Sequence, residues 1–150
     1  MPKKISPIAI NNFPNISTNC LGFAIGNDTP VRESDSLYSL DPNYSISEAF
    51  LKKLSELNYE ELPRKIESVD EAQENEFIIM VFDFTVFKFK HPFMGWEYYW
   101  DYHVVRREIN GTWVHKPGWK LPPCEIQTRS DWDAIYNEFG NNYVLFAVSA

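Results

Sequence analysis

The clearest periodic pattern of apolar residues lies in the first half of the chain. Four large apolar residues recur there at helical spacing, with charged residues between them: Phe50, Leu51, Leu54 and Leu57. Residues three and four apart share one face of an α-helix, so the pattern predicts an amphipathic helix over residues 47–58. Ser45 and Glu48 have the spacing of a capping box, which marks where this helix begins.

Farther along, the hydrophobic pattern changes to that of β-strands. Residues 77–84 are almost continuously apolar and predict a central strand, buried on both faces, that can extend to residue 89. Residues 98–108 predict a second strand. Asn110-Gly111 is a hairpin signal, and residues 112–116 supply the returning strand. The prolines at positions 117, 122 and 123 then predict an end to regular pairing.

A last helix and a closing strand complete the pattern. Ser130 and Asp133 have capping spacing, and Gly140 is a stop signal. One face of this helix is apolar and carries Trp132, Ile135, Tyr136 and Phe139. Residues 143–148 predict a closing strand. Helices that precede and follow a group of strands, in a chain of 150 residues, predict one domain, 1–150, of the α+β class.

The N-terminal part is less regular. Residues 1–18 carry three prolines and several asparagines and predict an extended arm. Helix signals then favour a short helix that begins at or just before Cys20. Residues 28–44 are polar and without a period, so we expect a loop that lines or covers a cleft.

The charge of the chain narrows the classes of partner. The formal net charge is -7, whereas a general nucleic-acid binder needs a basic surface to neutralise phosphates. No window reaches the apolar length of a membrane span, and the apolar residues 5–10 are too few and too interrupted for a signal-peptide core. We therefore expect a cytoplasmic protein, or one exported without a cleavable signal peptide, with no nucleic-acid or membrane partner.

Cys20 is the candidate nucleophile. The positive end of a helix and its unpaired N–H groups stabilise a thiolate, and the same N–H groups can receive an oxyanion. The only other cysteine is Cys124, which has no histidine near it in sequence and is expected to be inert. A disulfide between the two, and a buried Cys20 with no chemical role, remain alternatives. The chain has neither a glycine-rich phosphate loop nor local pairs of zinc ligands, so we expect no cofactor and no metal.

The candidate proton acceptors are His103 and His115, which lie on the two arms of the predicted hairpin. With a two-residue turn at Asn110-Gly111, the register sends the two imidazoles to opposite faces. With a three-residue loop, in which Gly111 takes a left-handed bulge conformation, Val105 faces His115. The two histidines then become diagonal neighbours on one face, and His115 can orient the ring of His103. The sequence leaves both turns open.

Two blocks of the chain carry a family resemblance. Asn19-Cys20-Leu21-Gly22-Phe23 resembles the Asp-Cys-Ser-Gly-Phe motif of NlpC-type cell-wall peptidases, and the spacing of the two histidines is similar to that in their hairpin. The chain also resembles small bacterial papain-like proteins with Asn-Cys, Ala-x-Gly, His-x-x-Arg, Gly-x-Trp and Lys-x-Gly in this order. The matching residues are Asn19-Cys20, Ala24-Ile25-Gly26, His103-Val104-Val105-Arg106, Gly111-Thr112-Trp113 and Lys116-Pro117-Gly118.

This resemblance implies a papain-like domain in which an N-terminal catalytic helix packs on an antiparallel sheet. It implies that Cys20 is the nucleophile, His103 the general acid and base and His115 the orienting residue, with Asn19 supporting the oxyanion site. The expected substrate is an amide of a peptide, a protein or the cell wall, cleaved through a thioester. The alternative is an inactive papain-like module, or a bacterial or phage effector, that binds a protein partner.

Two other groups of residues have open interpretations. The aromatic residues between positions 96 and 102 are expected to pack in the core, although they could also form a wall for a substrate. Arg106 and Arg107 are expected to be solvated or to pair with carboxylates.

Overall fold

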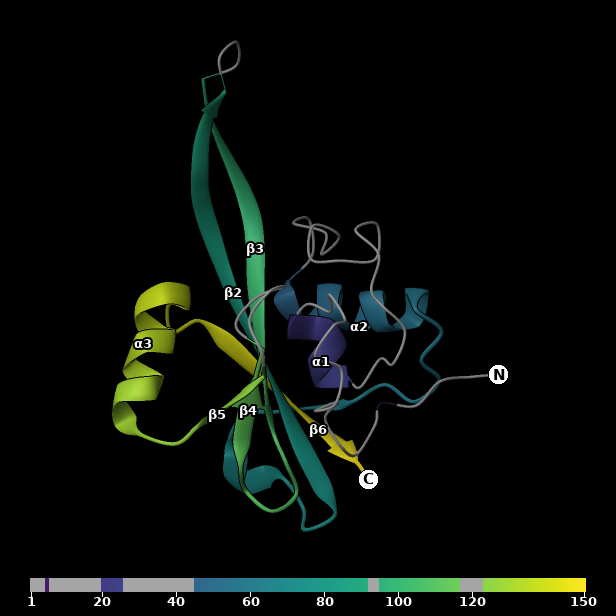
Figure 1. Cartoon of the computed structure of the whole chain (residues 1–150). Coiled ribbons are helices and arrows are strands. Elements are labelled where there is room, and N and C mark those ends of the chain that lie inside the picture. The colour runs from purple at the N-terminus through teal and green to yellow at the C-terminus, as the bar shows by residue number, and fades with distance from the viewer. Residues whose placement is uncertain (1–4, 6–19, 26–44, 92–94, 117–122) are drawn as a thin grey trace.

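The computed structural model describes Ile5 and residues 20–25, 45–91, 95–116 and 123–150. A sheet with the strand order β1-β6-β2-β3-β4-β5 forms the centre, and every neighbouring pair of strands is antiparallel. Helices α1 and α2 cover one face of this sheet, and α3 covers the other (Figure 1). The described part therefore has the expected α+β class.

The described elements follow one another in this order: α1 (Cys20–Ile25), α2 (Ile46–Glu56), β1 (Arg64–Ile66), the 3-10 helix η3 (Val69–Glu71), β2 (Glu76–His91), β3 (Gly95–Arg107), β4 (Trp113–His115), β5 (Cys124–Ile126), α3 (Arg129–Phe139) and β6 (Tyr143–Ser149). Strands β2 and β3 form a long hairpin, which reaches beyond the ends of β6 and β4 in Figure 1.

Strand β2 divides the hydrophobic core into two layers. Its alternate residues Phe77, Ile79 and Val81 belong to the core beneath α1 and α2, and Ile78, Met80 and Phe82 belong to the core beneath α3. Successive side chains of a strand point to opposite faces, so a strand with a core on both sides is apolar at every position. The prediction of a central strand buried on both faces is confirmed for residues 77–82.

The helices of the α1 side form where the apolar pattern predicts them. In α2, the Ser45 side chain accepts a hydrogen bond from the Glu48 N–H, as the capping spacing predicts. Its inward face includes Phe50, whose ring lies 4.9 Å from that of Phe146 on β6. Helix α1 begins at Cys20, also as predicted, and packs against β3 and β4.

Helix α3 has the predicted apolar face, but the prediction of its cap is wrong. The N-cap is Thr128 and not Ser130, and its partner is Asp131 and not Asp133. Thr128 has an extended backbone and accepts from the Asp131 N–H, while the Asp131 carboxylate accepts from the Thr128 N–H. Ser130 already lies in the first turn, since a capping box two residues upstream satisfies the N–H groups at the helix start.

Two short strands, β1 and β5, were not predicted from the sequence. Strand β5 resumes regular pairing after the prolines, in contrast to the expected end of pairing. Strand β1 pairs with β6 in a region where no strand was predicted. Each is three residues long, so neither is long enough to show an alternating pattern.

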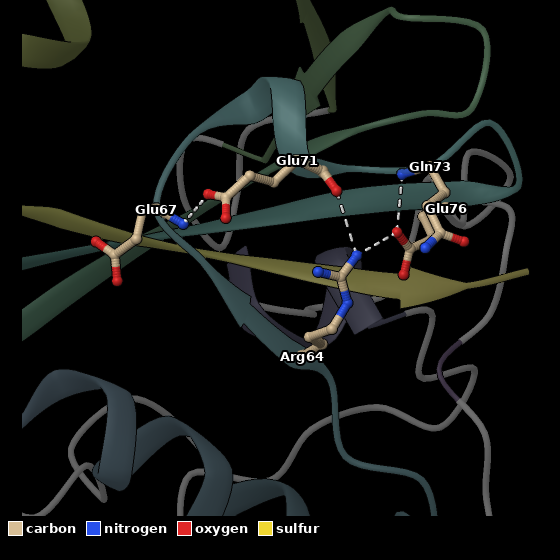
Figure 2. A network of polar contacts seen from close by, with 5 residues as sticks. All are labelled: Arg64, Glu67, Glu71, Gln73 and Glu76. Atoms are coloured by element: carbon tan, nitrogen blue, oxygen red, sulfur yellow. Dashed lines mark hydrogen bonds and ion pairs between the residues drawn. The ribbon is translucent and has the colours of Figure 1, made fainter.

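A polar network ties β1 to the start of β2. The Arg64 guanidinium donates to the Glu76 carboxylate at 2.6 Å and to the Glu71 backbone carbonyl at 3.3 Å. The Glu71 and Glu76 carboxylates also accept backbone N–H bonds from Glu67 and Gln73 (Figure 2). These contacts hold the edge strand and the intervening 3-10 turn against the sheet.

The turn between β3 and β4 is the three-residue form. Glu108 faces Thr112, with the Glu108 N–H donating to the Thr112 carbonyl at 2.7 Å. Gly111 has a φ of 93° and donates its N–H to the Glu108 carbonyl at 2.9 Å. Val105 is consequently the Cα partner of His115. This is the register in which the two histidines share a face.

Several expectations fall outside the described residues. They concern the extended arm over residues 1–18, apart from Ile5, the loop over residues 28–44 and Asn19. The described Ile5 lies in the core beneath α1 and α2.

Because Gly111 has a positive φ in this turn, we expect Gly111→Ala to lower the free energy of unfolding. A side chain at a positive φ costs about 1–2 kcal/mol, and an added Cβ meets no atom within 4 Å, so the cost is a backbone cost alone. We expect urea denaturation to show a loss of this size. Asn58→Gly is the matched control, since Asn58 also has a positive φ of 69° but follows a helix. Its stability should stay within about 0.5 kcal/mol of the parent. A Gly111→Ala protein as stable as the parent would contradict the turn.

Candidate functional site

The hairpin brings the two predicted histidines together. His103 Nε2 lies 2.8 Å from His115 Nδ1, a hydrogen bond in which one neutral ring donates and the other accepts. The two rings meet edge to face, with centroids 5.1 Å apart. Of the two arrangements that the sequence leaves open, the structure therefore has the one in which the imidazoles share a face.

The imidazole pair is buried beneath α3. His103 is only 2% exposed, and its ring stacks on Phe139 of α3 with 4.0 Å between the ring centroids. Its Cα partner on β2 is Phe82, which belongs to the same layer of the core. Burial, with a further contribution from His115, lowers the pKa of His103 from 6.5 to about 3. The ring is therefore neutral at physiological pH.

His115 is buried less deeply and has a carboxylate near it. Its pKa is also lowered by burial, and the negative charge of Asp131 on α3 acts in the opposite direction. Asp131 itself is held in its charged form by backbone N–H groups of Gln127 and Thr128, which lower the pKa of its carboxyl. The start of α3 thus places a fixed negative charge beside the imidazole pair.

Cys20 lies on the other face of the sheet. It belongs to the core layer beneath α1 and α2, together with Tyr102 and Val104 of β3. His103 stands between those two residues on the strand and points to the opposite side, against Phe139. The only hydrogen bond of the described His103 ring is the one to His115. The expected meeting of Cys20 with His103 and His115 is therefore wrong, because β3 separates them.

The charged residue that acts on Cys20 is a lysine, and not one of the two predicted histidines. Lys116 follows β4 directly and is only 4% exposed. Burial lowers its pKa, and the negative charge of the Cys20 thiolate acts to raise it. This electrostatic coupling is mutual, so the Lys116 ammonium stabilises the Cys20 thiolate in return. No pattern in the sequence indicates this role of Lys116, which only the packing of β4 against α1 reveals.

Arg106 fixes α1 against the sheet. Its side chain is fully buried, in contrast to the expectation of a solvated residue, although the expected pairing with a carboxylate is present. The guanidinium donates to the Ala24 carbonyl of α1 at 2.9 Å and lies 2.9 Å from the Glu108 carboxylate. It also stands over the Phe77 ring at 4.0 Å. A buried cation with these partners orients the helix that carries Cys20.

Cys124 is brought to a histidine that is distant in sequence. Strand β5 pairs with β4 so that Cys124 is the Cα partner of His115, and directly opposite residues of an antiparallel pair share a face. Cys20 and Cys124 form no disulfide, and Cys124 is exposed whereas Cys20 is buried. Cys124 has no histidine near it in the sequence, as noted above, but the fold places His115 opposite it.

Comparison with known proteins found no matching family model, no matching curated protein and no matching solved structure. In the part of the chain that the structure describes, no group of three or more metal-binding side chains is arranged to hold an ion. None of the described helices is long and apolar enough to cross a membrane.

The lowered pKa of His103 predicts that the protein loses stability in acid. Between pH 6.5 and about 3 the unfolded chain binds a proton at this residue and the folded chain does not. Stability is therefore complete above pH 6.5 and falls toward pH 3, by up to about 1.4 kcal/mol per pH unit for this group. Urea denaturation at successive pH values should show a shallower dependence for His103→Gln than for the parent.

Phe139→Leu is the matched control for that experiment. It weakens the packing on the same imidazole without removing the titrating group, so it should lower stability by a similar amount at every pH. If His103→Gln kept the full acid dependence of the parent, the neutral buried state of His103 would be refuted.

Proposed function

We propose that this chain is a papain-like cysteine hydrolase that cleaves an amide through a thioester at Cys20. The observation that supports the proposal is the packing of α1, which begins at Cys20, against β4, which the buried Lys116 directly follows, together with the effect of the Cys20 charge on the pKa of Lys116. An ammonium beside a thiol favours the thiolate, which is the nucleophilic form of cysteine. The proposed nucleophile is the one expected from the sequence, and its charged partner is new.

Lys116 can also move the proton that amide cleavage requires. The Cys20 sulfur attacks the carbonyl carbon, and the carbon–nitrogen bond breaks as the ammonium gives a proton to the departing amine. Neutral Lys116 then takes a proton from the water that hydrolyses the thioester, which restores both groups. Burial lowers the pKa of Lys116 below its ordinary range, the direction that suits a proton donor near neutral pH.

The substrate is proposed at the level of its reacting bond. Peptidases, amidases and protein-glutamine deamidases share the formation of an acyl-enzyme from a carboxamide. The resemblance to NlpC-type peptidases adds peptides, proteins and cell-wall amides as substrate classes. The proposal includes all of these and rests on no substrate-binding residue.

A binding module without catalysis is the second candidate. It is favoured by the position of His103 and His115, which lie on the far face of the sheet from Cys20. Cys20 is also only 5% exposed. On this alternative the papain-like domain has kept its helix and sheet and binds a protein partner, with Cys20 as a core residue.

Alkylation of Cys20 across a range of pH tests the proposal. We expect iodoacetamide to modify Cys20 at pH values well below the ordinary thiol pKa of about 8.5. Peptide mapping measures the modification of Cys20 separately from that of Cys124. Lys116→Met should slow the modification at neutral pH by about tenfold, which corresponds to a thiol pKa higher by about one unit. Lys65→Met is the matched control, because Lys65 is an exposed lysine of β1 and should change nothing.

The same experiment can support the alternative. Modification of Cys20 that follows an ordinary thiol titration, and that Lys116→Met leaves unchanged, would overturn the hydrolase proposal. The binding module would then be the favoured function.

A further inference from the structure

A second thiol site lies on the α3 side of the sheet, and it is independent of the proposed hydrolase site at Cys20. Cys124 and His115 are direct partners across the β4–β5 pair. Opposed residues of antiparallel strands have Cβ atoms about 4.5–5.5 Å apart, so rotation of the Cys124 side chain can bring its thiol to the imidazole. No hydrogen bond joins the two described side chains in the resting structure. Cys124 is exposed, and β5 is the last strand of the sheet, so a reagent can approach the sulfur from the edge.

His115 is arranged to take a proton from that thiol. The ring is only 8% exposed, and its Nδ1 is occupied by the 2.8 Å hydrogen bond to His103 Nε2. No other hydrogen bond of His115 is found within the described residues, so Nε2 is left for the thiol proton. When Nδ1–H donates to His103, the lone pair of the neutral ring is on Nε2, which is the tautomer a base requires.

We propose that Cys124 is a modification site for small disulfides, with His115 as its proton acceptor and His103 as the residue that positions His115. In this site the thiol comes from β5, the imidazole that accepts its proton from β4, and the imidazole that positions the acceptor from β3. It goes beyond the proposed hydrolase, because its three residues lie on the face away from Cys20.

The proposed reaction is a thiol–disulfide exchange. The Cys124 sulfur bonds to one sulfur of the small disulfide, and the disulfide bond breaks. The Cys124 proton moves to His115 Nε2 and then to the departing thiolate, which leaves as a thiol. Cys124 is oxidised to a mixed disulfide and the departing half is reduced, so no further oxidant is needed.

The charges near the site favour this reaction over acyl transfer. The groups that face His115 are His103 on β3, Cys124 on β5 and the Asp131 carboxylate on α3. Partial burial and then the charge of Asp131 raise the pKa of Cys124, so the resting thiol is protonated and needs a base. Acyl transfer also needs donors for an oxyanion, whereas disulfide exchange creates no oxyanion. A neutral disulfide is expected to react better than an anionic one beside Asp131.

The test is the pH profile of Cys124 modification by 2,2′-dithiodipyridine, a neutral disulfide, in the full chain. Peptide mapping assigns the mixed disulfide to its cysteine. If His115 assists, the rate should be level from below pH 6.5 to about pH 8, because the neutral imidazole is the base throughout. An unassisted thiol instead gains tenfold in rate for each pH unit. His115→Gln should convert the level profile into that steep one.

Variants of His103 separate positioning from packing. His103→Gln keeps an acceptor for the Nδ1–H of His115 and should retain the level profile. His103→Phe can still stack on Phe139 but accepts no hydrogen bond, and it should give the steep profile. Glu125→Gln, next to the thiol on the same exposed strand, is the control and should change nothing.

Three results would overturn the proposal. They are a steep profile in the parent protein, a mixed disulfide found at Cys20 and not at Cys124, and no mixed disulfide at all. None of these depends on whether Cys20 is catalytic, because that question is read from alkylation of Cys20 and its response to Lys116→Met.

Discussion

The alternation of side chains along β3 is the constraint on which the chemistry of this protein depends. Tyr102, Val104 and Arg106 point to the face that carries α1, and His103 points to the face that carries α3. A strand has no intermediate orientation, and the register with β2 is fixed by apolar residues on both faces. Neither imidazole can therefore move to Cys20 without moving a whole strand.

Arg106 makes this arrangement costly to change. A buried guanidinium must keep its partners, and its partners are the carbonyl of Ala24, the carboxylate of Glu108 and the face of Phe77. Removing one partner of a buried ion pair typically costs about 3–5 kcal/mol, a large part of the stability of a domain this size. A slip of β3 by one residue would turn Arg106 toward α3 and leave α1 without this contact.

The sequence was sufficient for the elements with a strong apolar period. Helix α2, strand β2 and the β3–β4 hairpin all follow from the spacing of their residues and from the turn residue Gly111. The short strands β1 and β5 were beyond prediction, because three residues carry no period and their pairing is decided by the sheet. The cap of α3 was misplaced because two capping boxes compete within six residues, and only the backbone shows which one is used.

The candidate site was predictable in one part and not in another. The meeting of His103 with His115 depends on the local geometry of one turn, for which the sequence offers only two forms, and the structure has the three-residue form. The distance from Cys20 to these histidines depends on which face of the sheet α1 covers, and that is set by packing between segments about eighty residues apart. The order of Cys20, His103 and His115 along the chain resembles that of a papain-like triad. The order of residues does not, however, indicate the face of the sheet on which each side chain lies. The same limitation hid the approach of Lys116 to Cys20 and of Cys124 to His115.

The three-residue turn at Gly111 also acts as a selector between the two faces of the sheet. If the same residues formed a two-residue turn at Asn110-Gly111, Ile109 would face Thr112, and β4 would shift by one position against β3. His115 would then point to the α1 face, which carries Cys20. The left-handed conformation of one glycine therefore decides which of the two thiol environments receives this imidazole.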